Sequence, residues 1–153
     1  MAVSLQKGQR FNLTGSKATV QALGDKFGSL ANPPYILLDK DDRTGESSDG
    51  ENLYINGAML PRIKRILVFT HIYEGVTDWR EANGEVTVKI PGKRDIIVRM
   101  DEYGSSKRVC AVALIENNGD GSCSIEKTVS FFTRYEEMSE AYHWGLKWYT
   151  ARK

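Results

Sequence analysis

Apolar and polar residues alternate along much of this chain, in short segments bounded by Gly, Pro, Asn and Asp. Alternation puts every second side chain on the same face of an extended strand, so the pattern predicts many short β-strands. Residues 85–90 and 95–100 are the clearest pair, since both place apolar side chains at every second position. The turn sequence Pro-Gly-Lys-Arg at 91–94 predicts that they form a β-hairpin.

A second hairpin is predicted from residues 108–116 and 122–132. The intervening residues 117–121, Asn-Asn-Gly-Asp-Gly, tolerate positive φ and favour a turn. The outgoing strand and the earlier segment 66–72 are almost continuously apolar, which is typical of central strands covered on both faces. Further strand-like segments are 11–14, 18–23, 35–38 and 52–55.

This succession of strands, without helical patterns between them, predicts a mainly β protein built as a two-sheet β-sandwich. The exception is the carboxyl end. There Thr133 and Glu136 have capping-box spacing, and apolar residues recur at three- and four-residue intervals through Trp148. We therefore expect a C-terminal helix packed on the sandwich. A chain of 153 residues without repeats or a long linker is expected to form one domain, 1–153.

The composition argues against several classes of protein. No stretch of about 18 or more apolar residues occurs, so no transmembrane segment is predicted. The first residues lack the apolar core of a secretion signal, which favours a cytoplasmic location. A net charge of +1 argues against a dedicated nucleic-acid-binding protein. Cys110 and Cys123 lack CxxC spacing, so free thiols are expected.

Negative charge is concentrated in residues 39–51. The carboxylates of this segment are Asp39, Asp41, Asp42, Glu46, Asp49 and Glu51. Six acids against the two bases Lys40 and Arg43 give the segment a net charge of −4. The rest of the chain therefore has a net charge of +5, since the whole chain has +1. Such carboxylates repel one another unless a cation neutralises them or water solvates them. Because calcium prefers oxygen ligands, the segment is interpreted as either a calcium-binding loop or a solvated acidic loop.

The segment is not an EF-hand, because Gly50 stands where that motif requires a bidentate Glu. It is similar instead to the calcium loop of TerD-type proteins, in the run Asp-Asp-Arg-Thr-Gly-Glu at 41–46 and Asp-Gly-Glu at 49–51. The start of the chain, the strand at 66–74 and the final hairpin also resemble this tellurium-resistance and stress-response family. Two features look closer to its TerA branch: Pro-Pro-Tyr at 33–35 and Trp-Gly-Leu-Lys-Trp at 144–148.

The resemblance implies a TerD-type β-sandwich that binds calcium through the six carboxylates of residues 39–51. TerD proteins carry a further Asp-Leu-Asp strand, which residues 16–38 lack, so we expect a single, weakened calcium site. The family also implies partners among other tellurium-resistance proteins, in a complex near the inner face of the membrane. The hypothesis is a non-catalytic, calcium-binding interaction module of a bacterial tellurite and stress-resistance system. The main alternative is a calcium-independent interaction scaffold that uses the acidic loop.

The cysteines, the histidines and Trp79 are the other candidates for chemistry. Cys110 and Cys123 are predicted to face each other across the second hairpin, which gives another alternative, a cysteine-dependent protein that processes oxyanions. His71 and His143 lack the spacing of a transition-metal site. Trp79 could lie on a loop as a stacking platform, although a structural role is favoured. No nucleophile elbow, cysteine-protease signature or phosphate-binding loop occurs, so an enzyme is not predicted.

Overall fold

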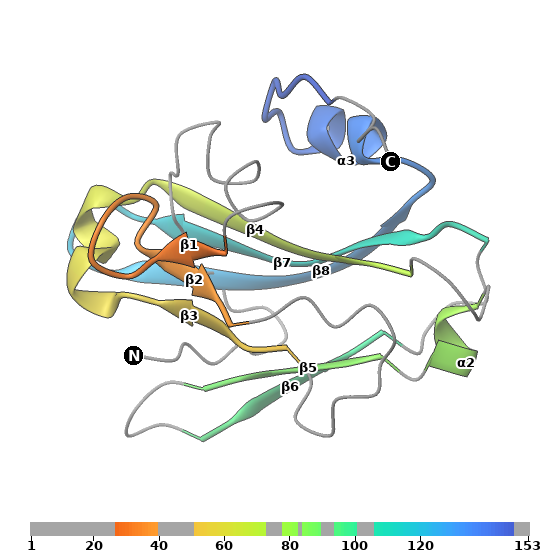
Figure 1. The fold of residues 1–153 in the computed structure, drawn as a ribbon, viewed down its shortest axis with the longest axis horizontal. Coiled ribbons are helices and arrows are strands. Elements are labelled where there is room, and N and C mark those ends of the chain that lie inside the picture. The colour runs from red at the N-terminus through yellow and green to blue at the C-terminus, as the bar shows by residue number, and fades with distance from the viewer. Residues whose placement is uncertain are drawn as a thin grey trace.

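The computed structural model describes residues 27–39, 51–72, 78–82, 84–89, 94–100 and 106–148. Its strands are β1 (Gly28–Ser29), β2 (Ile36–Leu38), β3 (Leu53–Ile55), β4 (Arg65–His71), β5 (Glu85–Val88), β6 (Ile96–Arg99), β7 (Val109–Asn117) and β8 (Cys123–Phe132). Its helices are the 3-10 helix η1 (Gly57–Arg62), α2 (Trp79–Ala82) and α3 (Tyr135–Ala141). The strands form three antiparallel sheets, in the orders β1-β2-β3, β4-β7-β8 and β5-β6 (Figure 1).

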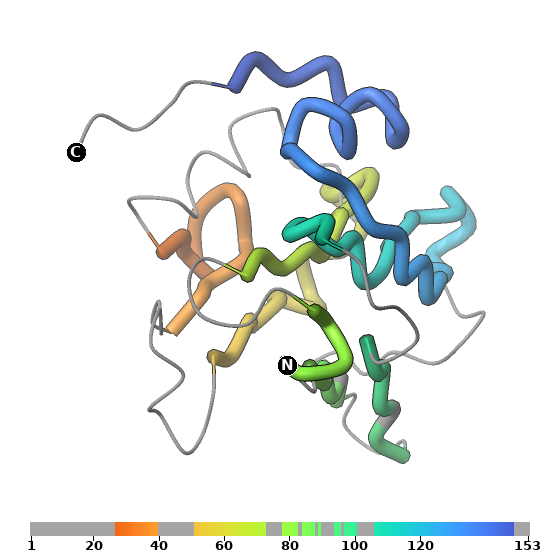
Figure 2. Tube along the Cα trace, turned by 90° about the vertical axis from the view of Figure 1, so that its right-hand side faces the viewer, coloured from red at the N-terminus to blue at the C-terminus, as the bar shows by residue number. Residues whose placement is uncertain are grey.

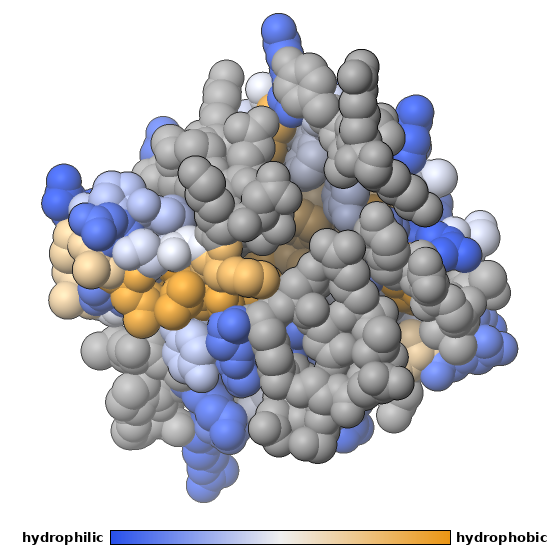
Figure 3. All heavy atoms as spheres, viewed as in Figure 1, coloured by the Kyte–Doolittle hydropathy of each residue, from blue (hydrophilic) through white to orange (hydrophobic). Residues whose placement is uncertain are grey.

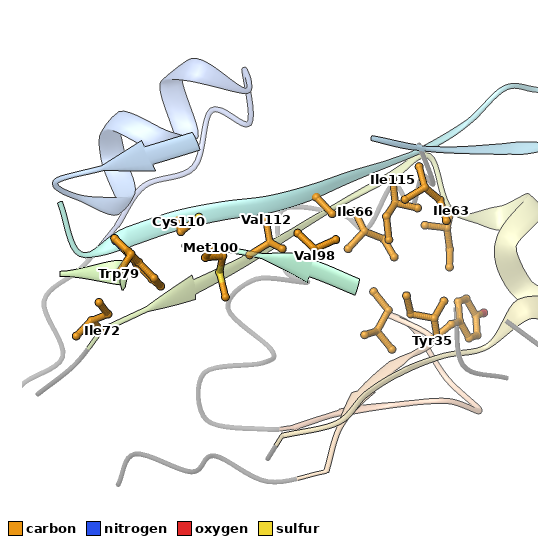
Figure 4. Close-up of a cluster of buried hydrophobic side chains, with 14 residues drawn as sticks. Tyr35, Ile63, Ile66, Ile72, Trp79, Val98, Met100, Cys110, Val112 and Ile115 are labelled. Atoms are coloured by element: carbon orange, nitrogen blue, oxygen red, sulfur yellow. The ribbon is translucent and has the colours of Figure 1, made fainter. Parts of the chain in front are cut away.

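The sheet β4-β7-β8 is the centre of the described fold. Its strand β7 is buried at every position from Val109 to Ile115, because both faces of the sheet are covered. One face packs against β2, β3 and β6 in the cluster shown in Figure 4. The other face packs against α3, which contributes the buried Met138. Figure 2 shows α3 and the two smaller sheets on opposite sides of the central sheet. The prediction of a central strand covered on both faces is therefore confirmed for β7, whereas β4 lies at the edge of the described sheet and is buried only at Ile66 and Leu67.

An irregularity in the middle of the central sheet changes which face its side chains occupy. The pairing of β7 with both neighbours shifts between Ala111 and Ala113. Consequently Val112 and Ala113, although adjacent, both join the cluster on the side of β6. On β8 the shift coincides with Val129, which has a φ of 38°. A positive φ is unfavourable for a β-branched residue, so the β-bulge holds Val129 in a strained conformation.

Both predicted hairpins are confirmed. Strand β5 pairs with β6 and β7 pairs with β8, and the second turn contains Gly119 and Gly121 at φ values of 81° and 86°. The strands expected near 35–38 and 52–55 are β2 and β3, which pair with each other. The segments 11–14 and 18–23 lie outside the described residues. No helix in the described part of the chain is long and apolar enough to cross a membrane.

The mainly β class with a C-terminal helix is confirmed, but the two-sheet sandwich is not. Strands β1-β2-β3 and β5-β6 pack against the same face of the central sheet, yet they are hydrogen-bonded as two separate sheets. Among the described residues no strand pairing joins β3 to β5, whereas side chains of both sheets enter the same core.

The C-terminal helix differs from the prediction at both ends. Its N-cap is Arg134, without a side-chain cap, and the Thr133 N–H donates to Glu137 Oε2 at 3.0 Å. The carboxylate that accepts this hydrogen bond therefore belongs to Glu137, one residue after the Glu136 that the capping-box spacing predicted. The helix ends at Ala141 because His143 adopts a φ of 54°, outside the helical region. Trp148 belongs to the segment after the helix and stacks on Tyr135, with ring centroids 4.9 Å apart.

Candidate metal-binding site

The acidic segment connects two paired strands, β2 and β3. Leu38 and Leu53 are the last paired residues, and Asp39 and Asn52 follow them on the loop side. The backbone N–H of Asp39 donates to the carbonyl oxygen of Asn52 at 3.0 Å. In return, Asn52 donates its backbone N–H to Asp39 Oδ1 and its side-chain amide to Oδ2, both at 2.8 Å. These hydrogen bonds close the base of the loop.

Closure of the base orients the carboxylate of Asp39. Both of its oxygens accept hydrogen bonds from Asn52, which fixes the direction in which the carboxylate faces. Asp39, Glu51 and Asn52 are exposed to solvent. Their donor atoms are hard oxygens, which fit calcium better than the softer transition metals. The closed base is therefore compatible with a calcium site built from residues of the loop.

The structure describes only the ends of the predicted ligand set. Asp39 and Glu51 flank the loop, whereas Asp41, Asp42, Glu46 and Asp49 lie outside the described residues. Within the described ranges, no group of three or more His, Cys, Asp or Glu residues could hold a metal ion. Asn52 closes the base of this candidate site, and sequence reasoning missed it. The available signal was its position, directly before β3 and opposite an Asp directly after β2.

His71 lies at the end of β4 and bonds to the C-terminal helix. Its Nδ1 is 2.6 Å from the hydroxyl of Tyr135, and the two rings meet edge to face. Burial lowers the pKa of His71, and the positive charge of Arg108 lowers it further. The neutral imidazole therefore accepts or donates one hydrogen bond here, in a structural contact between the sheet and α3.

We expect His71 to make stability depend on pH below about 6.5. Its pKa is lower in the folded chain, so the unfolded chain binds more protons as the pH falls. The contribution of His71 is complete above the unfolded pKa and is lost as the pH falls through the folded pKa. Between about pH 7.5 and 5, the free energy of unfolding measured in urea should fall less for His71→Gln than for wild type. The exposed His143→Gln serves as control, and parallel curves for wild type and His71→Gln would contradict the assignment.

The cysteines do not face each other, contrary to the prediction. Cys110 lies opposite Phe131, and Cys123 lies opposite Asn117, at the other end of the hairpin. Neither cysteine forms a disulfide, and Cys110 has no solvent exposure. Burial raises the pKa of the Cys110 thiol to about 12, although Lys127 acts in the opposite direction. A thiol with this pKa is a poor nucleophile at neutral pH, because the thiolate is the reactive form.

Trp79 is a core residue and not a stacking platform. Its side chain is 2% exposed, and the indole N–H donates to the carbonyl oxygen of Lys107 at 2.6 Å. The ring also contacts Phe131, with centroids 5.7 Å apart. In Figure 4 it lies in the same buried cluster as Cys110 and Ile72. Trp79 therefore anchors α2 to the central sheet.

Comparison with known proteins identifies a similar sequence. A protein of Alcaligenes sp, described as "Tellurium resistance protein TerA", is 38% identical to this chain over 148 residues. The match covers 96% of the chain but 43% of that protein, so the chain spans less than half the length of this relative. No family model matches the chain, and no solved structure matches it.

Proposed function

Because this chain is a member of the TerA-type family of tellurium-resistance proteins, we propose that it is a non-catalytic, calcium-binding interaction module of a tellurite-resistance and stress-response system. The observation that carries the calcium assignment is the hydrogen-bonded closure of the acidic loop by Asp39 and Asn52. Closure places the carboxylate of Asp39 at the start of a segment with a net charge of −4. The ligand set is Asp39, Asp41, Asp42, Glu46, Asp49 and Glu51.

Binding of one calcium ion would offset the repulsion between these carboxylates. Calcium takes six to eight oxygen ligands in flexible geometry, which a loop of acids, hydroxyls and carbonyls supplies. The loop is attached to β2 and β3, so ordering by the ion would be transmitted to that sheet. We infer further that β1-β2-β3 and β5-β6 act together as the second layer of a TerD-type sandwich, since both pack on one face of the central sheet.

The surface beside the loop supports a role in protein interaction. Phe27 and Tyr54 are 42% and 37% exposed on the sheet that carries the loop. Figure 3 shows apolar side chains at the surface over β1 and β2. Exposed aromatic residues are enriched where proteins meet partners. We propose that the partners are other tellurium-resistance proteins, in a cytoplasmic complex near the inner face of the membrane.

One observation favours a second candidate, a calcium-independent scaffold. The hydrogen bonds between Asp39 and Asn52 hold the two ends of the loop together, and in this alternative the loop presents its carboxylates directly to a basic partner surface. The cysteine-dependent alternative has less support, since Cys110 is buried and its pKa is raised.

Calorimetric titration of metal-free protein with calcium separates these candidates. Wild type should bind calcium with measurable heat, and Glu46→Gln combined with Asp49→Asn should weaken binding by at least about tenfold, because two ligand charges are lost. Asn52→Ala should also weaken binding by about tenfold, although it removes no carboxylate, because it releases an oxygen of Asp39 from its orienting partner.

The matched control neutralises two carboxylates outside the loop, Asp95→Asn and Glu136→Gln. This variant loses the same formal charge, so unchanged calcium affinity would show that the loop effect is local. Absence of calcium heat up to about millimolar concentration, with partner capture indifferent to chelator, would overturn the calcium proposal in favour of the scaffold.

A further inference from the structure

A second candidate binding surface lies where η1 leads into β4. A surface hollow of ≈ 360 Å³ is formed there by the end of η1, the link from η1 to β4, and the β7–β8 turn with the last residue of β7. The described residues that line it are Pro61, Arg62, Ile63, Lys64, Asn117, Asn118 and Gly119. This volume is within the range of ligand sites, and the described lining includes two cationic side chains and no acidic ones.

The walls of the hollow are joined by one side chain. The amide nitrogen of Asn117 lies 3.2 Å from the carbonyl oxygen of Leu60 and 3.1 Å from that of Ile63. The side-chain oxygen of Asn117 accepts the N–H of Gly119 at 2.8 Å. Asn117 therefore connects the segment that carries the cations to the turn on the opposite wall, so the shape of the hollow is set before a ligand arrives.

The two cations, Arg62 and Lys64, are held on one side of the chain. Between them Ile63 is 3% exposed and has an extended backbone, with φ −113° and ψ 135°. Figure 4 shows Ile63 in the buried cluster with Tyr35 and Ile115. Arg62 and Lys64 are both exposed and both line the hollow, and the extended backbone of Ile63 separates them by roughly 6.6 Å along the chain.

Neither cation is neutralised within the described part of the chain. The ion pairs among the described residues do not include Arg62 or Lys64. The guanidinium carbon of Arg62 lies 5.6 Å from the ring centroid of Tyr35, which steadies the charged group without cancelling its charge. Asp120, a nearby acid in the turn, already accepts hydrogen bonds from the backbone N–H and the hydroxyl of Ser122.

We propose that this hollow binds an acidic protein segment in which carboxylates occupy alternate positions. An extended peptide places side chains i and i+2 on one face at the same spacing as Arg62 and Lys64, so two carboxylates can meet both cations at once. The hollow is also larger than one oxyanion requires, and the amides of Asn117 and Asn118 already donate hydrogen bonds to Ile63 and Ser122. These features favour a peptide over a small anion. The proposal does not depend on calcium.

The test measures binding of a fluorescent peptide that alternates Glu with Ser, by anisotropy, in the presence of calcium chelator and at low salt. Wild type should bind it, and binding should weaken as ionic strength rises. The variant Arg62→Gln with Lys64→Gln should bind at least about fivefold more weakly. The control, Lys89→Gln with Lys147→Gln, removes the same charge elsewhere and should bind as wild type does.

A peptide of the same composition that repeats Glu-Glu-Ser-Ser has no two Glu residues at i and i+2, so it tests the spacing, and inorganic phosphate tests the size of the ligand. Weaker binding of this paired peptide, and poor competition by phosphate, would support the proposal. Equal binding of both peptides, competition by phosphate at similar concentration, or equal affinity in wild type and the Arg62, Lys64 variant would overturn it. Chelator is present throughout, so failure here would be distinct from failure to bind calcium.

Discussion

Ile115→Ala is expected to lower the free energy of unfolding by about 2–5 kcal/mol. Ile115 is 1% exposed in the middle strand of the central sheet. It lies directly opposite Ile66 on β4 and Ile125 on β8, and both of these residues are buried too. Truncation removes three carbon atoms from the centre of this row and leaves a cavity. Urea denaturation followed by circular dichroism measures the effect.

The matched control is Ile97→Ala, the same substitution in another strand. Ile97 is 52% exposed on β6, so its truncation should change the free energy of unfolding by less than about 0.5 kcal/mol. If Ile115→Ala does not fold, Ile115→Val gives a milder test, with an expected loss of about 0.5–1.5 kcal/mol. Equal destabilisation by the Ile115 and Ile97 variants would contradict the described core.

Cys110 is expected to resist thiol reagents in the folded protein. With a pKa of about 12, its thiolate at pH 8 is scarcer than that of an ordinary cysteine by about a thousandfold, and burial also blocks access. The variant Cys123→Ser isolates Cys110. Its reaction with an aromatic disulfide reagent, followed by absorbance, should be slower by at least about a hundredfold in buffer than in denaturant.

The complementary variant, Cys110→Ser, reports on Cys123, which is only partly buried at the start of β8. Its thiol should react faster in buffer than that of Cys110. Rapid labelling of Cys110 in the folded chain would contradict its burial and revive the cysteine-dependent alternative. In cells, tellurite tolerance unchanged by replacing both cysteines, at equal protein abundance, would remove that alternative.

Hairpins were the best predicted part of the fold, because their signals are local. Alternation fixes which side chains share a face, and the turns at 91–94 and 117–121 limit how the strands pair. The position of the second turn also shows why Cys110 and Cys123 do not face each other. With the turn centred near Gly119, Asn117 pairs with Cys123, so Cys110, seven residues further from the turn, cannot also face it.

The arrangement of sheets could not be predicted in the same way. Whether two groups of strands join by hydrogen bonds or only by side-chain packing depends on contacts between distant segments. Ile36, Ile55 and Val98 enter one core with β7 although β2-β3 and β5-β6 are separate sheets. The residue at which α3 ends could not be predicted from local spacing either. Apolar spacing continues to Trp148, but Trp148 reaches Tyr135 from a non-helical segment and not from a longer helix.

The candidate metal site was predicted from residue types, and the closure of its base was not. Acidic clustering at 39–51 is visible in the sequence because charge is a property of composition. The reciprocal bonding of Asp39 and Asn52 depends on the pairing of β2 with β3, which brings residues 13 apart in the chain into contact. A polar residue at each end of a hairpin connection is therefore a useful signal for such a closure.

The bulge at Val129 affects how the protein behaves at high concentration. Strand β8 is long and pairs with β7 on one side within the described sheet, and a long regular edge strand is a template for adding strands from other molecules. At Val129 the positive φ interrupts the even spacing of donors and acceptors along β8. We therefore expect the interruption at Val129 to make this edge of β8 a poorer template for a strand from another molecule.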